Sequence, residues 1–171
     1  MLVPPGLRRG LAVAALLVLA GGGAAATLWT RPRGDPAQPI TFSHRVHAEQ
    51  FQIPCLYCHT AATRSPVAGI PSVERCMGCH KLTATTRPEV IKLKGYFSRG
   101  EPIPWIRIHS LPRFVYFSHR RHVLRDIPCQ ACHGEVEKMD TVRQVGPLTM
   151  GWCVECHRKE QASLDCLTCH Q

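Results

Sequence analysis

All ten cysteines of this chain of 171 residues belong to one repeated motif, Cys-x-x-Cys-His. Two cysteines three positions apart lie on one face of a helical turn, where both sulfurs can reach one edge of a single bound group. The histidine that follows can then reach a metal at the centre of that group. This spacing is the attachment signal for c-type haem. The five copies are Cys55/Cys58/His59, Cys76/Cys79/His80, Cys129/Cys132/His133, Cys153/Cys156/His157 and Cys166/Cys169/His170.

Other uses of paired cysteines explain this pattern less well. Zinc binds paired Cys-x-x-Cys units, but a zinc site does not require a histidine after every pair. A thioredoxin-like motif needs one pair in a βαβ context. Disulfides are compatible with an oxidising compartment, yet they give no reason for the histidines. The sequence therefore predicts five covalently bound haem c groups, whose proximal iron ligands are His59, His80, His133, His157 and His170.

Five histidines remain outside the motifs, the number that five irons need as distal ligands. Four of them form two His-x-x-His pairs, in which both side chains lie on one side of a helical turn. Both members of a pair cannot bind one iron, because the motif histidine holds its opposite face. Each pair therefore predicts two closely packed haems. The five predicted distal ligands are His44, His47, His119, His122 and His109.

His109 has no counterpart elsewhere in the sequence, so the fifth distal ligand stays open between His109, Met139 and Met150. A methionine ligand would raise the potential of that haem. The competing interpretations are a surface histidine and methionines that only pack in a core. Histidine on both faces of every iron leaves no open site for a substrate, which favours electron transfer over catalysis.

An internal repeat organises the chain after residue 40. Phe42-Ser43-His44-Arg45-Val46-His47 recurs as Phe117-Ser118-His119-Arg120-Arg121-His122, and each copy is followed by Ile-Pro-Cys-x-x-Cys-His. A second motif follows in each copy, seven residues after Gly69 or Gly146. We therefore expect a pentahaem domain over residues 40–171, with modules at about 40–85 and 115–160 and an extra haem motif at 166–170.

The N-terminal residues 1–30 are predicted to be a transmembrane anchor or a signal segment. Arg8 and Arg9 precede an uncharged run from Gly10 to Thr30, which is long enough to cross a bilayer core as one helix. Its apolar part and the small residues after it also resemble a cleavable signal peptide. Residues 31–39 contain three prolines and predict an extended linker.

The formal charge of +9 does not indicate nucleic-acid binding, because the basic residues are scattered along the chain. Five haems carry about ten propionate charges, which nearly offset this excess. Numerous prolines and glycines predict short elements. We expect short helices on the cysteine motifs, little sheet, and one longer helix from about Arg87 to Ser98 that is capped by Thr86 and ends at Gly100.

The pattern Phe-x-His-x-x-His before Cys-x-x-Cys-His resembles the multihaem cytochrome c3/c7 class. This resemblance implies a mostly irregular chain with short α-helices around stacked haems, in which His44 faces His59 and His119 faces His133. The whole chain is also similar to the membrane-anchored pentahaem subunit of bacterial alternative complex III. The similarity rests on the N-terminal segment, the five motifs, and the stretches Gly69–Ser72, Glu101–Trp105, Phe114–His119 and Met150–Cys153.

That resemblance implies an electron-relay subunit of a quinol-oxidising membrane complex, not catalytic by itself, which passes electrons toward a periplasmic acceptor or an oxidase. Its implied partners are an iron–sulfur subunit, quinol-binding integral membrane subunits and a monohaem cytochrome c. The implied location is the inner membrane, with one anchor and the haem domain on the periplasmic side. The alternatives are a soluble c3/c7-like shuttle and a multihaem reductase, which would need an open iron.

Overall fold

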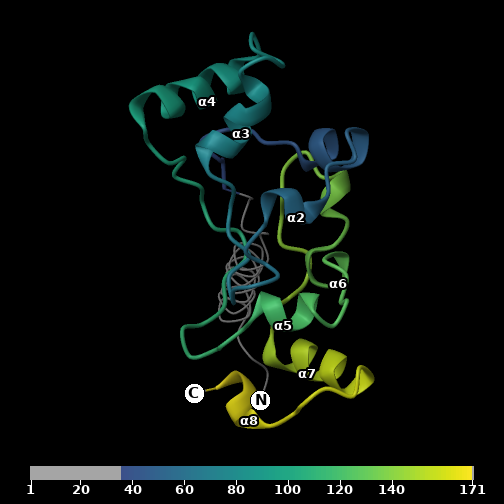
Figure 1. The fold of residues 1–171 in the computed structure, drawn as a ribbon. Helices are drawn as coiled ribbons and strands as arrows, with labels where there is room; N and C mark the ends of the chain where they lie inside the picture. The colour runs from purple at the N-terminus through teal and green to yellow at the C-terminus, as the bar shows by residue number, and fades with distance from the viewer. Residues whose placement is uncertain (1–35, 171) are drawn as a thin grey trace, which may run out of the picture. The chain divides into compact units, whose positions relative to one another are not determined.

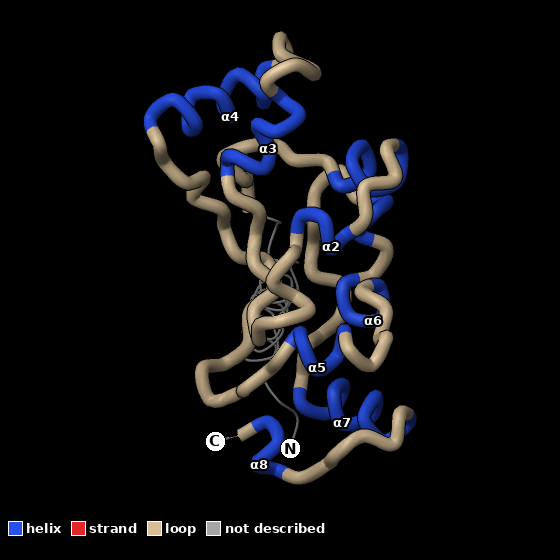
Figure 2. Tube along the Cα trace, in the orientation of Figure 1, coloured by secondary structure: helices blue, strands red, loops and turns tan. Residues whose placement is uncertain are grey.

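The computed structural model describes residues 36–170, which fall within one unit of the chain, Asp35–Gln171. The predicted anchor and most of the predicted linker lie outside the described residues. No helix between residues 36 and 170 has the length and apolar character needed to cross a bilayer. Short helices joined by long loops make up these residues, and they contain no strand (Figures 1 and 2). The elements are η1 (Arg45–Gln50), α2 (Cys55–Cys58), α3 (Val73–His80), α4 (Pro88–Arg99), α5 (His119–Val123), α6 (Gln130–His133), η2 (Val136–Lys138), α7 (Met150–Lys159) and α8 (Cys166–Cys169).

Helix α4 forms where the sequence predicts the longer helix. Pro88 occupies its first turn, and Gly100 ends it in a left-handed conformation with φ +66°. The predicted cap was wrong, since the N-cap residue is Arg87 and no side chain caps the helix. Lys92 and Glu89 form an ion pair on its exposed face, and the backbone N–H of Thr41 donates to Glu89. This helix is therefore tied to the beginning of the described chain.

One small hydrophobic core lies between α3 and α4, which Figure 1 shows side by side at one end of this unit. Its members come from the beginning of the described chain, from α3, from α4 and from the segment after α4, and Cys76, Tyr96 and Trp105 pack against them. The segment Glu101–Trp105 is not helical, as its prolines predict. The buried core residues are Ile40, Val73, Met77, Leu93 and Ile103.

The two sequence modules hold each other reciprocally. The backbone N–H groups of His119 and Arg120 donate to carbonyls of the loop that follows the first motif, at Pro66 (3.0 Å) and Ser65 (3.2 Å). The N–H of Arg45 donates to the carbonyl of Met139 (3.0 Å), in the loop that follows the third motif.

Side chains reinforce the second of these contacts. Asp140 forms an ion pair with Arg45 and accepts a hydrogen bond from the Ser43 hydroxyl at 2.8 Å. Each His-x-x-His segment is thus positioned by the other module.

The two modules also share a turn that sequence periodicity does not reveal. Gln52 (φ 54°) and Asp126 (φ 57°) occupy equivalent positions, one residue before Ile53 or Ile127, and both adopt the left-handed conformation. The N–H of Ile53 donates to the carbonyl of His47, and that of Ile127 to the carbonyl of His122. This turn reverses the chain between the paired histidines and the first cysteine of the module.

The core between α3 and α4 predicts the effect of a cavity there. Replacing the buried Leu93 by alanine should lower the free energy of unfolding of the haem-loaded protein by about 2–5 kcal/mol. The matched control is Ile91→Ala on the exposed face of the same helix, which should change it by less than about 0.5 kcal/mol. Urea unfolding followed by circular dichroism measures both. Equal losses in the two variants would contradict this placement of the core.

Candidate haem-binding site

Each Cys-x-x-Cys-His motif lies on a short helix: α2, α3, α6, α7 and α8 carry the five copies in chain order. The two cysteines of a motif therefore share one side of a helical turn, as haem attachment requires. None of the ten cysteines forms a disulfide. Between residues 36 and 170, no three histidine, cysteine or acidic side chains converge on a point where they would hold a bare metal ion.

The motifs follow one another in space in an order that differs from the order in the chain. Burial raises the pKa of the Cys76 thiol, and the nearby thiol of Cys58 raises it further. Burial also raises the pKa of Cys129, and the neighbouring thiol of Cys55 raises it further. These neighbours place the second motif beside the first, and the first beside the third.

The same contacts continue toward the C-terminus. Burial raises the pKa of Cys132, with further contributions from Cys156 and Cys153. Burial raises the pKa of Cys153 as well, and the neighbouring thiols of Cys169 and Cys156 raise it further. The fourth motif therefore lies between the third and the fifth, and the spatial order of the motifs is second, first, third, fourth, fifth.

Histidines outside the motifs face histidines inside them. The residues that could ligate one iron from opposite sides come from different elements, and the resemblance to the c3/c7 class implies two of these pairings, His44 with His59 and His119 with His133. Three such pairs are His47 and His80, with ring centroids 6.0 Å apart, His119 and His133 at 6.2 Å, and His122 and His157 at 6.1 Å.

His44 and His59 form a fourth pair, close enough that a positive charge on one ring disfavours protonation of the other. Burial, followed by the neighbouring His59 and His47, lowers the pKa of His44 to about 4. Burial, followed by nearby histidines of which His109 contributes most, lowers the pKa of His133 to about 4. Both imidazoles are therefore neutral at pH 7, and neutral imidazole is the form that binds a metal.

Backbone carbonyls orient most of these rings through Nδ1, which leaves Nε2 for a metal. The Nδ1 of His59 lies 2.6 Å from the carbonyl oxygen of Gly69, and that of His157 lies 2.8 Å from Ser163. In the His-x-x-His segments, Nδ1 of His47 and His122 each lies 2.8 Å from the carbonyl oxygen four residues earlier. The Nδ1 of His44 is buried and has no hydrogen-bond partner.

Phe42 and Phe117 are site residues to which the sequence analysis gave no role. The Phe117 ring stacks on His122 (centroids 4.6 Å apart, planes at 27°) and meets His119 edge-on (4.8 Å, 89°). Phe42 makes the same two contacts with His47 (4.3 Å, 23°) and His44 (4.9 Å, 84°). Their presence in both copies of the repeat was the signal that could have identified them.

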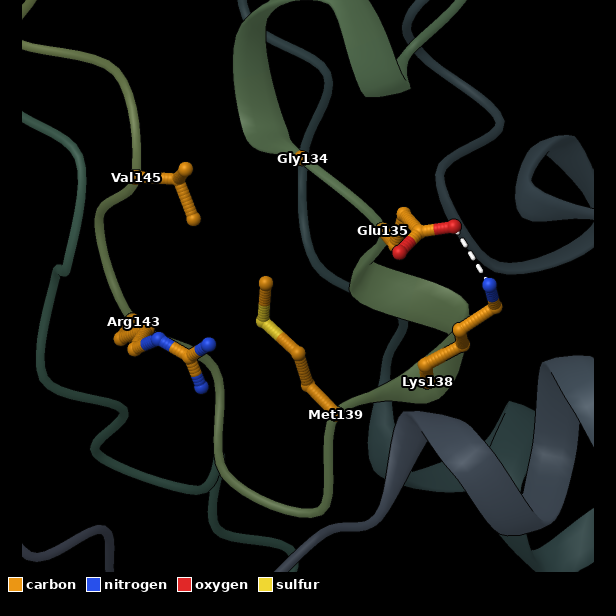
Figure 3. A pocket seen from close by; sticks show the side chains of 6 residues that line it. All are labelled: Gly134, Glu135, Lys138, Met139, Arg143 and Val145. Carbon is orange, nitrogen blue, oxygen red and sulfur yellow. Dashed lines mark hydrogen bonds and ion pairs between the residues drawn. The ribbon is translucent and has the colours of Figure 1, made fainter.

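The three candidates for the fifth distal ligand lie in different surroundings. His109 contacts His133, with ring centroids 4.4 Å apart. Met139 is buried, and its side chain extends beside Val145 and Arg143 in a cavity of about 340 Å³ (Figure 3). Met150 is 67% exposed at the start of α7. Among the three, His109 is the candidate whose ring packs against a motif histidine.

The burial pattern of the described residues is the one expected of a protein that binds several large apolar groups. Only eight hydrophobic side chains are buried among them, and no side chain is completely enclosed. Large hydrophobic side chains such as Leu56, Tyr57 and Met150 are exposed within or beside the motifs. Haem faces are broad and apolar, and they would cover these side chains. A cavity of about 410 Å³, lined by Val73, Trp105 and their neighbours, lies beside the second motif.

Comparison with known proteins agrees with this chemistry. Residues 115–171 match the family described as cytochrome c7 and related cytochrome c. The C-terminal part of the chain is thus similar to cytochrome c7 and related cytochromes c. It is also 28% identical over 162 residues, which cover 78% of this chain and 77% of the relative, to the menaquinone reductase, multiheme cytochrome c subunit, of Nitratidesulfovibrio vulgaris. Haem c as the cofactor and electron transport as the activity are thereby supported, and the predicted multihaem architecture of short helices is confirmed for the described residues.

The Phe117 contacts predict a local stability effect. Phe117→Ala removes two aromatic pairs and should lower the free energy of unfolding of the haem-loaded cytochrome by about 1–3 kcal/mol. Tyr116→Ala is the matched control, because that neighbouring side chain is 54% exposed, and it should cost less than about 0.5 kcal/mol. Urea titration measures both. A Phe117→Ala protein as stable as the control would mean that the ring does not brace the two histidines.

Proposed function

We propose that this cytochrome binds five haem c groups and relays electrons along them as a subunit of a membrane complex that oxidises quinol. The observation that carries the proposal is the repeated spacing of 6.0–6.2 Å between a histidine outside the motifs and one inside them. An imidazole nitrogen lies about 2 Å from a first-row metal and its ring centroid about 1.2 Å further, so two rings across one metal have centroids roughly 6 Å apart. Three pairs meet this requirement.

The proposed ligand sets follow the internal repeat. In each module the first histidine of His-x-x-His serves the first motif, and the second histidine serves the second motif. The proposed axial pairs are His44 with His59, His47 with His80, His119 with His133, and His122 with His157, and His170 is the proximal ligand of the fifth haem. The thioether bonds are proposed at Cys55, Cys58, Cys76, Cys79, Cys129, Cys132, Cys153, Cys156, Cys166 and Cys169.

This arrangement would let a short chain conduct electrons from one haem site to the next. Haem c, when bound, supplies one-electron iron chemistry. Because His44 and His47 share one helical turn, they hold the first and second haem sites together, and His119 and His122 do the same for the third and fourth. The contact between Cys55 and Cys129 joins the two pairs. The proposed path therefore runs through the second, first, third, fourth and fifth motifs in that order.

The proposed complex is of the alternative complex III type. Residues 1–30 would anchor the subunit in the inner membrane, with the haem domain on the periplasmic side. Its proposed partners are an iron–sulfur subunit, quinol-binding integral membrane subunits and a monohaem cytochrome c. The name of the relative as a subunit of a menaquinone reductase supports a quinone-linked complex. A chain of haems conducts in both directions, so the direction is set by the potentials of donor and acceptor.

The haem count tests the proposal directly. The pyridine haemochrome assay should give five haems per polypeptide, and the intact mass should equal that of the chain with five haems attached. The control is Cys166→Ala/Cys169→Ala, which removes one attachment site and should give four. A wild-type protein with two haems or fewer would reject the proposal.

The order of the path is tested by removing haem sites. Cys129→Ala/Cys132→Ala interrupts the middle of the proposed path, so reduction by a limiting donor should split into two kinetic phases. Cys166→Ala/Cys169→Ala removes only its end, and the remaining haems should still reduce in one phase. Stopped-flow absorbance measures both variants, after circular dichroism has shown that each retains its helices. A single phase in the first variant would contradict the order.

A further inference from the structure

His133 differs from the other motif histidines in what its Nδ1 contacts. Its Nδ1 lies 3.3 Å from Nε2 of His109, and the two rings meet edge-on at 87°. For the other histidines of residues 36–170 whose Nδ1 has a hydrogen-bond partner, that partner is a backbone carbonyl. These carbonyl pairs are His47 with Ser43, His59 with Gly69, His80 with Thr83, His119 with Pro66, His122 with Ser118, His157 with Ser163, and His170 with Phe114.

The internal repeat shows which partner His109 replaces. In the first module the carbonyl of Gly69, seven residues before the second motif, accepts from Nδ1 of His59. The equivalent residue of the second module is Gly146, whose carbonyl accepts a hydrogen bond from the Gln144 side chain instead. A Cβ at Gly146 would lie 3.0 Å from the carbonyl oxygen of Cys132, so this glycine packs tightly against the third motif. His109 therefore occupies the role that a carbonyl has in the first module.

We propose that His109 is a positioning residue for His133 and not an axial ligand of any iron. This inference rests on the proposed function, in which His133 is the proximal ligand of the third haem. The Nδ1–H of His133 donates to Nε2 of His109, which fixes the tautomer that leaves Nε2 of His133 for the iron. The nitrogen that a distal histidine commonly offers to a metal is then already used in His109.

The contact has two consequences for the third haem. It holds the plane of the His133 ring, which lies nearly parallel to that of His119, at 7°. It also raises the basicity of His133 as a ligand, because a hydrogen bond accepted from the outer nitrogen puts more electron density on the inner one. A more basic ligand favours ferric over ferrous iron, so this contact lowers the potential of the third haem.

Among these Nδ1 partners, His109 is the one that a substitution can remove, because the others are backbone carbonyls. His109→Ala deletes the acceptor. His109→Gln keeps an acceptor, since the amide oxygen of glutamine can take the place of Nε2, but it does not supply an imidazole to iron. The two variants therefore separate positioning from ligation.

The test uses the full-length, haem-loaded protein. In His109→Ala the ferric EPR spectrum should show no more high-spin haem than the wild type. Potentiometric titration should show one haem shifted to a more positive potential by about tenfold in its ferric-to-ferrous equilibrium, or about 59 mV for one electron. In His109→Gln that potential should return toward the wild-type value.

The positive control is His119→Ala, which removes a proposed axial ligand and should create one high-spin haem. A new high-spin haem in both His109 variants would overturn the inference and make His109 a ligand. Unchanged potentials in His109→Ala would overturn it as well. The haem count of the wild type is read separately, so fewer than five haems would refute the proposed function while an intact count with an altered spin state would refute only the role of His109.

Discussion

The scarcity of buried side chains is the constraint on which the rest of this structure depends. In residues 36–170 the hydrophobic core is one small cluster between α3 and α4, while Leu56, Tyr57 and Phe114 remain exposed. Ordering a residue costs about 1–2 kcal/mol of conformational entropy, which such a core does not offset over the whole domain. The apolar faces of covalently attached haems supply the missing surface, and a thioether bond keeps each of them in place whatever the local stability of the chain. The haems would then form most of the apolar interior of the domain.

Reciprocal docking of the two modules explains how histidines far apart in sequence come to face one another. The loop after the first motif receives the backbone of His119 and Arg120, and the loop after the third motif receives that of Arg45. Each histidine pair is therefore held by its own phenylalanine and by the opposite module. Each proposed axial pair lies within one module, so the opposite module positions these ligands and does not supply them.

Much of this organisation could be predicted because it depends on local sequence patterns. The cysteine motifs, the repeat and the ends of α4 at Pro88 and Gly100 depend on residues a few positions apart. The Thr86 cap failed because the chain adopts an extended conformation at Arg87, so the helix begins one residue later. The contacts of His109 could not be predicted, since they depend on the path of the loop between Gly100 and Phe114 and have no counterpart in the other module. The left-handed turns at Gln52 and Asp126 were not predicted either, because neither residue is a glycine, the residue that most often adopts this conformation.

The two modules show that similar sequences do not give identical surroundings to the predicted haem ligands. The first His-x-x-His segment leads into a π-helix, η1, whereas the second forms the short α-helix α5. His59 is oriented by a glycine carbonyl, whereas His133 is oriented by another side chain. His44 has an unpartnered Nδ1, whereas its counterpart His119 contacts Pro66.

The two differences in hydrogen bonding would act on the electron density of a proposed axial nitrogen, and ligand basicity is one of the few means by which a protein tunes a haem potential. Duplication of a module would thus repeat the same placement of histidine ligands, and with it the same spacing between neighbouring haem sites. Divergence in hydrogen bonds around the duplicated histidines then makes its sites unequal, and electrons moving along a chain of unequal sites settle preferentially on those with the more positive potential.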